Sequence, residues 1–148
     1  MVGRPAGVVA LTALALALLA SAPSDARAQA AIDLEVMVSL ISDEPGKIDP
    51  RAEELDRKLG KKIRYESIEV LDVKRMRLAI DDVGSVSLPD GTGIYIKPLV
   101  LDERGALIHV EWAARMDTQL RVKSGQLVVL GPQRHGPDQI VVSLKSRF

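Results

Sequence analysis

Residues 106–116, with the sequence Ala-Leu-Ile-His-Val-Glu-Trp-Ala-Ala-Arg-Met, form the longest alternating run in the C-terminal half of the chain. The alternation places Ile108, Val110 and Trp112 on one face and polar side chains on the other. A period of two is typical of a half-buried β-strand. We therefore predict that this run is the central core strand of a β-meander over residues 83–148.

Turn signals divide the rest of this half into short strands. The sequence Leu88-Pro89-Asp90-Gly91-Thr92 has Pro at the second turn position and Gly where a left-handed residue is needed, which predicts a hairpin. Pro98 cannot donate to a β-ladder, so its strand is expected at an edge or a bulge. The flanking strands are expected at residues 85–88, 94–101, 120–122, 127–129 and 140–144.

The N-terminal part of the expected domain starts with a half-buried strand over residues 32–40, where apolar and mostly polar residues alternate. A short helix is then expected to begin at Pro50 and end at Leu59, because Asp49 can cap it and Gly60 can stop it. Within residues 61–80 the apolar residues change parity. This predicts two strands or one bulged strand.

Seven or eight short strands and one short helix predict a mainly β fold. An antiparallel β-sandwich or a small open barrel would bury the apolar faces of these strands. An α+β arrangement is the alternative, because the chain opens with a strand followed by a helix.

Residues 1–30 have the features of a cleaved signal peptide, followed by a single β-rich domain over residues 31–148. Arg4 supplies a positive start, an uncharged apolar stretch follows, and Ala28-Gln29-Ala30 has the small-residue pattern of a cleavage site. An uncleaved anchor is the alternative, but the apolar stretch is shorter than the roughly 20 residues that a spanning helix needs. We expect a periplasmic or secreted protein cleaved after Ala30, with no transmembrane segment in its mature part.

The composition narrows the classes of function. Without cysteine there is no disulfide and no lipidation site of the lipobox type. Loss of residues 1–30 leaves 18 basic and 19 acidic residues, a net charge of −1, which gives no indication of nucleic-acid binding. One Trp, two Tyr and one Phe are too few for a platform on which bases or sugars stack.

No catalytic or metal-binding pattern stands out. His109 and His135 are the two imidazoles of the chain, and the expected domain contains neither Gly-x-Ser-x-Gly nor Ser-x-x-Lys. Two histidines without cysteine do not make a zinc signature, and the Asp residues lack the spacing of a calcium loop. We expect a protein that is not an enzyme, with no metal and no cofactor.

The expected loop from Gly131 to Asp138 is the first candidate ligand site. Its Gly and Pro residues suggest a defined loop that presents Arg134 and His135 together, where they could receive a carboxylate or a phosphate. A rigid connection between two strands, without a ligand, is the alternative interpretation.

The second candidate site is a basic patch. Residues 31–56 carry a net charge of −6, and residues 57–77 carry +5. If the fold separates the two segments, the basic one could meet an anionic partner such as an envelope polymer or an acidic protein; otherwise the two segments pair with each other. The patch would consist of Lys61, Lys62, Arg64, Lys74, Arg75 and Arg77.

Three short motifs add a resemblance. Leu88-Pro89-Asp90-Gly91, Val128-Val129-Leu130-Gly131 and Ile140-Val141-Val142-Ser143-Leu144 together resemble uncharacterised exported bacterial β-rich proteins. The resemblance implies export and a β fold, and it transfers no activity. We predict a non-enzymatic exported envelope protein that binds or scaffolds an envelope protein or an anionic envelope polymer. A small hydrolase or ligand-binding protein with its site at the loop from Gly131 to Asp138 is the alternative.

Overall fold

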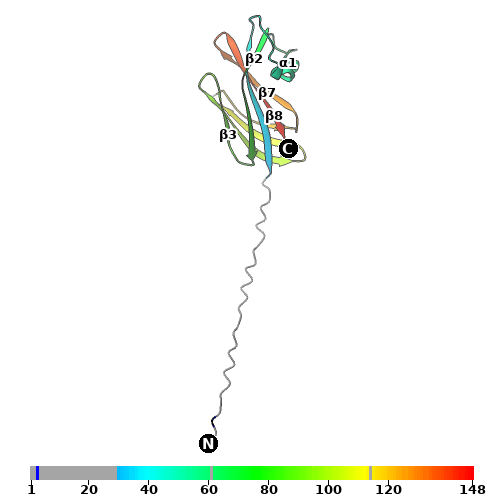
Figure 1. Ribbon diagram of the computed structural model, residues 1–148, viewed down its shortest axis with the longest axis vertical. Coiled ribbons are helices and arrows are strands. Elements are labelled where there is room, and N and C mark those ends of the chain that lie inside the picture. Colours follow the sequence, from blue (N-terminus) through cyan, green and yellow to red (C-terminus); the bar gives the residue numbers. More distant parts are fainter. Residues whose placement is uncertain (1–2, 4–29, 61, 114) are drawn as a thin grey trace.

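The computed structural model describes Gly3 and residues 30–60, 62–113 and 115–148, so most of the expected signal peptide lies outside the described residues. Eight strands form two antiparallel sheets of four, sheet A in the order β2-β1-β8-β7 and sheet B in the order β3-β4-β5-β6 (Figure 1). The predicted mainly β fold is confirmed and is consistent with a β-sandwich. The strands are β1 (Ala31–Ser42), β2 (Ser67–Ala79), β3 (Gly84–Ser87), β4 (Gly93–Asp102), β5 (Gly105–Trp112), β6 (Met116–Val122), β7 (Leu127–His135) and β8 (Asp138–Arg147).

The main core lies between the two sheets and includes the predicted inward face of β5. Ile108, Val110 and Trp112 are at most 1% exposed and belong to one apolar cluster with residues of β1 and β8. The single strand predicted for residues 106–116 is wrong in length. The chain turns after Trp112, where the Arg115 amide donates to the Trp112 carbonyl. The alternation continues beyond the turn because Trp112 pairs with Met116, and cross-strand partners project to the same face of a sheet.

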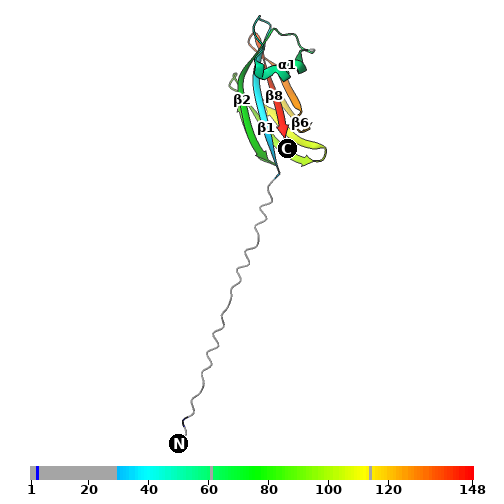
Figure 2. The ribbon, with the colours of Figure 1, turned by 45° about the vertical axis from the view of Figure 1, so that its right-hand side comes forward.

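A second apolar cluster lies on the other face of sheet A, under the helix. The 3₁₀ turn η1 (Pro50–Ala52) runs into α1 (Glu53–Leu59), and Figure 2 shows α1 lying across β1 and β8. Leu55 and Leu59 are buried there against Met37 and Ile41 of β1. The strand that the sequence predicted over residues 32–40, with one buried face, is therefore covered on both faces in its second half. The alternating pattern did not reveal this, because a methionine such as Met37 fits a buried or an exposed position.

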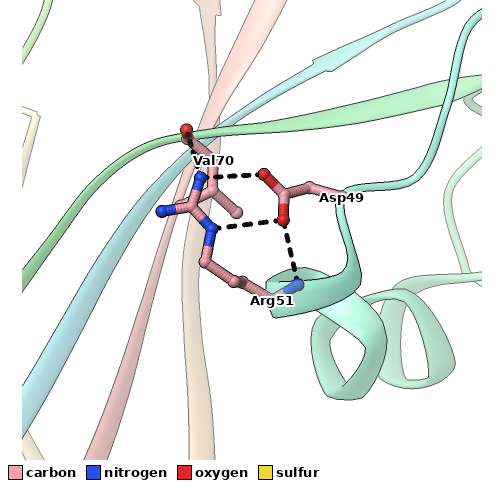
Figure 3. Close-up of polar contacts among 3 residues, drawn as sticks. All are labelled: Asp49, Arg51 and Val70. Atoms are coloured by element: carbon pink, nitrogen blue, oxygen red, sulfur yellow. Dashed lines mark hydrogen bonds and ion pairs between the residues drawn. The ribbon is translucent and has the colours of Figure 1, made fainter.

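The start of the helical segment is fixed by its cap. The Asp49 carboxylate accepts hydrogen bonds from the Arg51 amide at 2.9 Å and from the Arg51 guanidinium at 2.9 and 3.2 Å (Figure 3). The same guanidinium donates to the Val70 carbonyl of β2 at 3.4 Å. The predicted cap at Asp49 and helix end at Leu59 are confirmed, and the contact with Val70 ties the helical segment to the edge of sheet A.

The parity change in the basic segment comes from one bulge. Val38 of β1 is opposite Asp72, whereas the next residue, Ser39, is opposite Val70. Leu71 is thus an extra residue on β2, and its side chain is 39% exposed. Of the two predicted possibilities, one bulged strand is correct, although it starts only at Ser67.

Two further predictions concern proline residues. Pro98 lies at a register shift in β4, so the predicted bulge is present, although β4 is an inner strand of sheet B. The loop predicted from Gly131 to Asp138 is wrong. Gly131 and Pro132 lie within an irregularity of β7, and β7 then pairs with β8 as far as His135 and Asp138.

Among the described residues, no helix is long and apolar enough to cross a membrane.

Candidate functional site

The candidate site is a cavity of about 270 Å³ beside the turn that joins β7 and β8, and we call it the hairpin pocket. Two arginines, Arg64 and Arg134, and two carboxylates, Asp43 and Asp138, line it. The other lining residues are Ile41, Ser42, Ile63, Tyr65, Gly136, Pro137 and Gln139.

Arg64 is held at the pocket by contacts of the two residues that follow it, Tyr65 and Glu66. The Glu66 amide donates to the Ser42 carbonyl at 2.8 Å, which attaches the segment to the end of β1. The Tyr65 hydroxyl donates to the Asp56 carbonyl at 3.1 Å and also contacts the Asp56 carboxylate. Burial and the hydrogen bond to Asp56 raise the pKa of Tyr65, so its hydroxyl remains a proton donor at neutral pH.

Arg134 reaches the pocket from β7. It pairs with Gln139 of β8 next to a two-residue turn, in which Gly136 has a positive φ of 61°. A positive φ is readily adopted by glycine, so the chain can reverse tightly here. The pairing of Ile41 with Gln139 brings the end of β1 beside this hairpin and so joins the two halves of the pocket.

The two pocket arginines differ from most arginines of the described chain in having no ion-pair partner among the described residues. Arg57 and Arg147 also have none, but neither lines this pocket. The arginines that do have a carboxylate oxygen within 3.4 Å are Arg51, Arg75, Arg77, Arg104, Arg115 and Arg121.

The pocket contains both signs of charge. Asp43 and Asp138 line it, and neither forms an ion pair with a described residue. A bound carboxylate or phosphate would use the planar donors of the guanidinium groups. The two aspartates would accept hydrogen bonds from hydroxyl or amine groups next to that anion, so the lining suits a ligand that carries an anionic group beside donors.

The structure separates the two residues that the sequence grouped in one loop. Arg134 lines the hairpin pocket, but His135 does not. Successive residues of a strand point to opposite faces, and His135 lies near enough to Asp90 to contribute to the lowered pKa of that carboxyl group. The Asp90 pKa is lowered, first by the hydrogen bond from the Thr92 hydroxyl and further by Arg115 and His135. The structure therefore does not bring Arg134 and His135 into one pocket.

The predicted basic patch does not form one surface in the described residues. Lys62 and Arg64 lie near the end of α1, where a second depression also contains Asp56 and Tyr65. Lys74 of β2 donates to the Ser85 carbonyl at 2.6 Å. Lys61 lies outside the described residues.

The other two patch residues pair with the acidic segment, as the alternative interpretation expected. Arg75 lies 2.9 Å from Glu35, and Arg77 lies 3.2 Å from Asp33. This follows from the register, because β1 and β2 are antiparallel neighbours that place these residues directly opposite one another. Exposed pairs of this kind contribute little to stability.

Sequence reasoning identified Arg134 and Arg64 separately, and it missed that they share one pocket.

Among the described residues there is no group of three or more His, Asp or Glu side chains that could hold a metal ion. Comparison with known proteins finds no matching family model, no matching curated protein and no matching solved structure. By its fold the chain is a mainly β protein of two antiparallel sheets, with one short helix packed on sheet A.

Proposed function

We propose that this chain is an exported, non-enzymatic binding module of the cell envelope, and that the hairpin pocket receives a carboxylate or phosphate of its ligand. One observation carries the proposal. Arg64 and Arg134 come from distant parts of the chain, line the same cavity, and have no ion-pair partner among the described residues.

The size of the cavity supports recognition of an end group. Pockets for drug-sized ligands usually have about 300–1,000 Å³, and the hairpin pocket has about 270 Å³. A terminal group of a polymer or peptide fits this volume better than a long stretch of either. The proposed ligand is therefore an envelope component that inserts one anionic group between the two guanidinium groups.

The lining of the pocket supports binding without catalysis. Among the described lining residues, Ser42 and Tyr65 carry hydroxyl groups, and no histidine or lysine lies beside them. A serine nucleophile needs a base within hydrogen-bond reach. The described lining offers only the carboxylates Asp43 and Asp138 as bases, and the Ser42 hydroxyl is hydrogen-bonded to neither; it accepts from the Glu44 amide at 3.1 Å.

Titration of the protein with inorganic phosphate and with acetate tests the site. We expect saturable shifts of the backbone amide signals of Arg134 and Gln139 in nuclear magnetic resonance spectra, and no such shifts with glycerol. Arg64→Gln and Arg134→Gln should each weaken binding by about tenfold, or about 1.4 kcal/mol. Arg104→Gln is the matched control, because Arg104 is an exposed arginine already paired with Asp102.

Two results would contradict the proposed site: shifts that grow linearly with either salt, or equal affinities in the pocket variants and the control. The proposal of export is tested separately by the mass of the protein recovered outside the cytoplasm. Cleavage after Ala30 predicts a first residue of Ala31, and a mass that includes residues 1–30 would contradict it.

A further inference from the structure

Each of the two sheets ends in two edge strands, and three of these four edges are protected against pairing with another chain. Strand β3 is only four residues long. Strand β2 carries the bulge at Leu71, and its Lys74 reaches across to the Ser85 carbonyl. Strand β7 contains Pro132 within an irregularity, and the Lys58 ammonium group donates to the Leu127 carbonyl. Short length, bulges, lysine and proline are the usual means by which proteins prevent edge pairing.

Strand β6, the fourth edge, has none of these features. It is seven residues long, contains no proline or lysine, and pairs with β5 without a register shift. No backbone hydrogen bond outside its pairing with β5 involves these described residues. Its core-facing residues Met116 and Leu120 remain partly exposed, whereas Ile108 and Val110 of β5 are 1% and 0% exposed. The edge of sheet B is therefore open along the whole of β6.

We propose that β6 pairs antiparallel with β6 of a second copy of this chain, around a two-fold axis at Gln119, so that two copies of sheet B join into one continuous sheet. Addition of a strand to an open edge supplies main-chain hydrogen bonds. In a two-fold interface each copy uses the same patch, so the strand must be complementary to itself.

The sequence of β6 has this self-complementarity. With Gln119 opposite Gln119 of the second copy, Asp117 lies opposite Arg121 of that copy, and Arg121 opposite its Asp117. Opposite charges directly across an antiparallel pair are favourable, and like charges are unfavourable. An axis at Asp117 would place two aspartates opposite each other, and an axis at Arg121 would do the same with two arginines.

The length of the strand selects the same axis. An axis at Gln119 is the one that pairs all seven residues of β6, from Met116 opposite Val122 to Val122 opposite Met116. A slip by one residue would place outward side chains opposite core-facing ones.

The ion pairs within each copy are compatible with this arrangement. Asp117 lies 2.5 Å from His109, and Arg121 lies 3.1 Å from Asp102. These contacts hold both side chains on the outer face of sheet B. A guanidinium has five N–H donors and a carboxylate has two acceptor oxygens, so each can serve a second partner.

Sedimentation equilibrium of the full chain, expressed with its own N-terminal segment, tests the proposal. We expect a reversible dimer. Arg121→Asp and Asp117→Arg should each weaken association by at least about tenfold, because each places two like-charged pairs across the axis. The double variant Asp117→Arg/Arg121→Asp should restore the wild-type affinity. Arg75→Asp on β2 is the matched control for charge, and it should leave the dimer intact.

A protein that stays monomeric at every concentration tested would overturn the proposal. A dimer that both single variants leave unchanged would also overturn it, as would a folded double variant that does not recover association. Hydrogen exchange on the unaltered protein decides the matter if a variant does not fold. Amides of β6 must exchange more slowly as the concentration rises, and those of the β2 edge must not.

Discussion

Arg134 and His135 are neighbours in the sequence, yet their side chains leave β7 on opposite faces. Arg134 lines the hairpin pocket, and His135 lies near Asp90. The proposed anion site therefore has no imidazole beside its arginines. Because the two residues occupy different environments, substitutions at them should have separable effects.

We predict that His135→Ala leaves both ligand binding and stability nearly unchanged. The free energy of unfolding should change by no more than about 0.5 kcal/mol, as for most surface substitutions. The measurement is urea denaturation, together with phosphate titration and assays on ester, phosphoester, glycoside and peptide substrates. Turnover that falls by about 10²–10⁴-fold in His135→Ala would identify a general base and contradict the non-enzymatic proposal.

The second prediction concerns the core. Trp112 is fully buried between the sheets, so Trp112→Ala should lower the free energy of unfolding by about 3–5 kcal/mol. In urea the transition midpoint should fall while its slope stays the same. Glu111→Ala, an exposed position on the other face of β5, is the control and should change stability by less than about 0.5 kcal/mol.

Trp112→Phe sharpens this test. The Trp112 indole Nε1 is buried without a hydrogen-bond partner in the structure. An unsatisfied buried donor costs about 1–3 kcal/mol, and phenylalanine removes it. Trp112→Phe should therefore cost much less than Trp112→Ala. Phenylalanine also leaves a smaller cavity than alanine, so an equal loss of stability in the two variants would contradict the prediction.

The parts of the fold that were predictable depend on local patterns. The inward face of β5 follows from alternation over a few residues, and the hairpin between β3 and β4 follows from the turn residues around Asp90. The failures occurred where another element decided the outcome. Met37 looked like an outward residue of a half-buried strand, but the helix covers it. Gly131 and Pro132 predicted a loop, but they lie within an irregularity of β7, and the strand pairs with β8 again beyond them.

The pocket was only half predictable for the same reason. Arg134 was predicted as a site residue from its neighbours in the sequence. Its position in the same pocket as Arg64, in contrast, depends on the strand order of sheet A. That order places β8 beside β1, so the β7–β8 turn meets the segment that follows α1. Alternation and turn signals contain no information on which strands become neighbours, so the sequence could not indicate the pair.

The third prediction concerns the bulge in β2. Leu71 is the extra residue opposite β1, so its deletion leaves both flanking registers intact, with Val70 and Asp72 still opposite their present partners. We expect the deletion variant to fold and to keep the two-sheet structure. Circular dichroism and the urea midpoint are the measurements.

Deletion of Lys74, three residues away on the same strand, is the matched control. It would shift one side of β2 by one residue, and a shift of one residue exchanges the two faces of a strand. Met76 and Leu78, which pack into the core between the sheets, would then compete with Arg75 and Arg77 for inward positions. Deletion of Lys74 should therefore destabilise the protein far more than deletion of Leu71. Similar losses in the two variants would contradict the assignment of Leu71 as the bulge residue.

The last prediction is a pH dependence at the helix cap. Hydrogen bonds from the Arg51 side chain, then from its backbone amide, lower the pKa of Asp49 from 3.8 to about 2 (Figure 3). A carboxyl group whose pKa is lower in the folded state stabilises the fold above its unfolded pKa. This contribution is therefore complete at neutral pH, and it is lost as the pH falls from about 3.8 to about 2.

Asp49→Asn isolates this contribution, because asparagine can still cap the helix but carries no charge. The urea midpoint of the variant should be below that of the unaltered protein at neutral pH. The gap should close as the pH falls from 3.8 to about 2. Added salt at neutral pH should also narrow it, because the Asp49–Arg51 pair is near the surface. A gap that is constant over this pH range would show that Asp49 acts only as a neutral hydrogen-bond acceptor, and that its charge contributes nothing to holding the helical segment on sheet A.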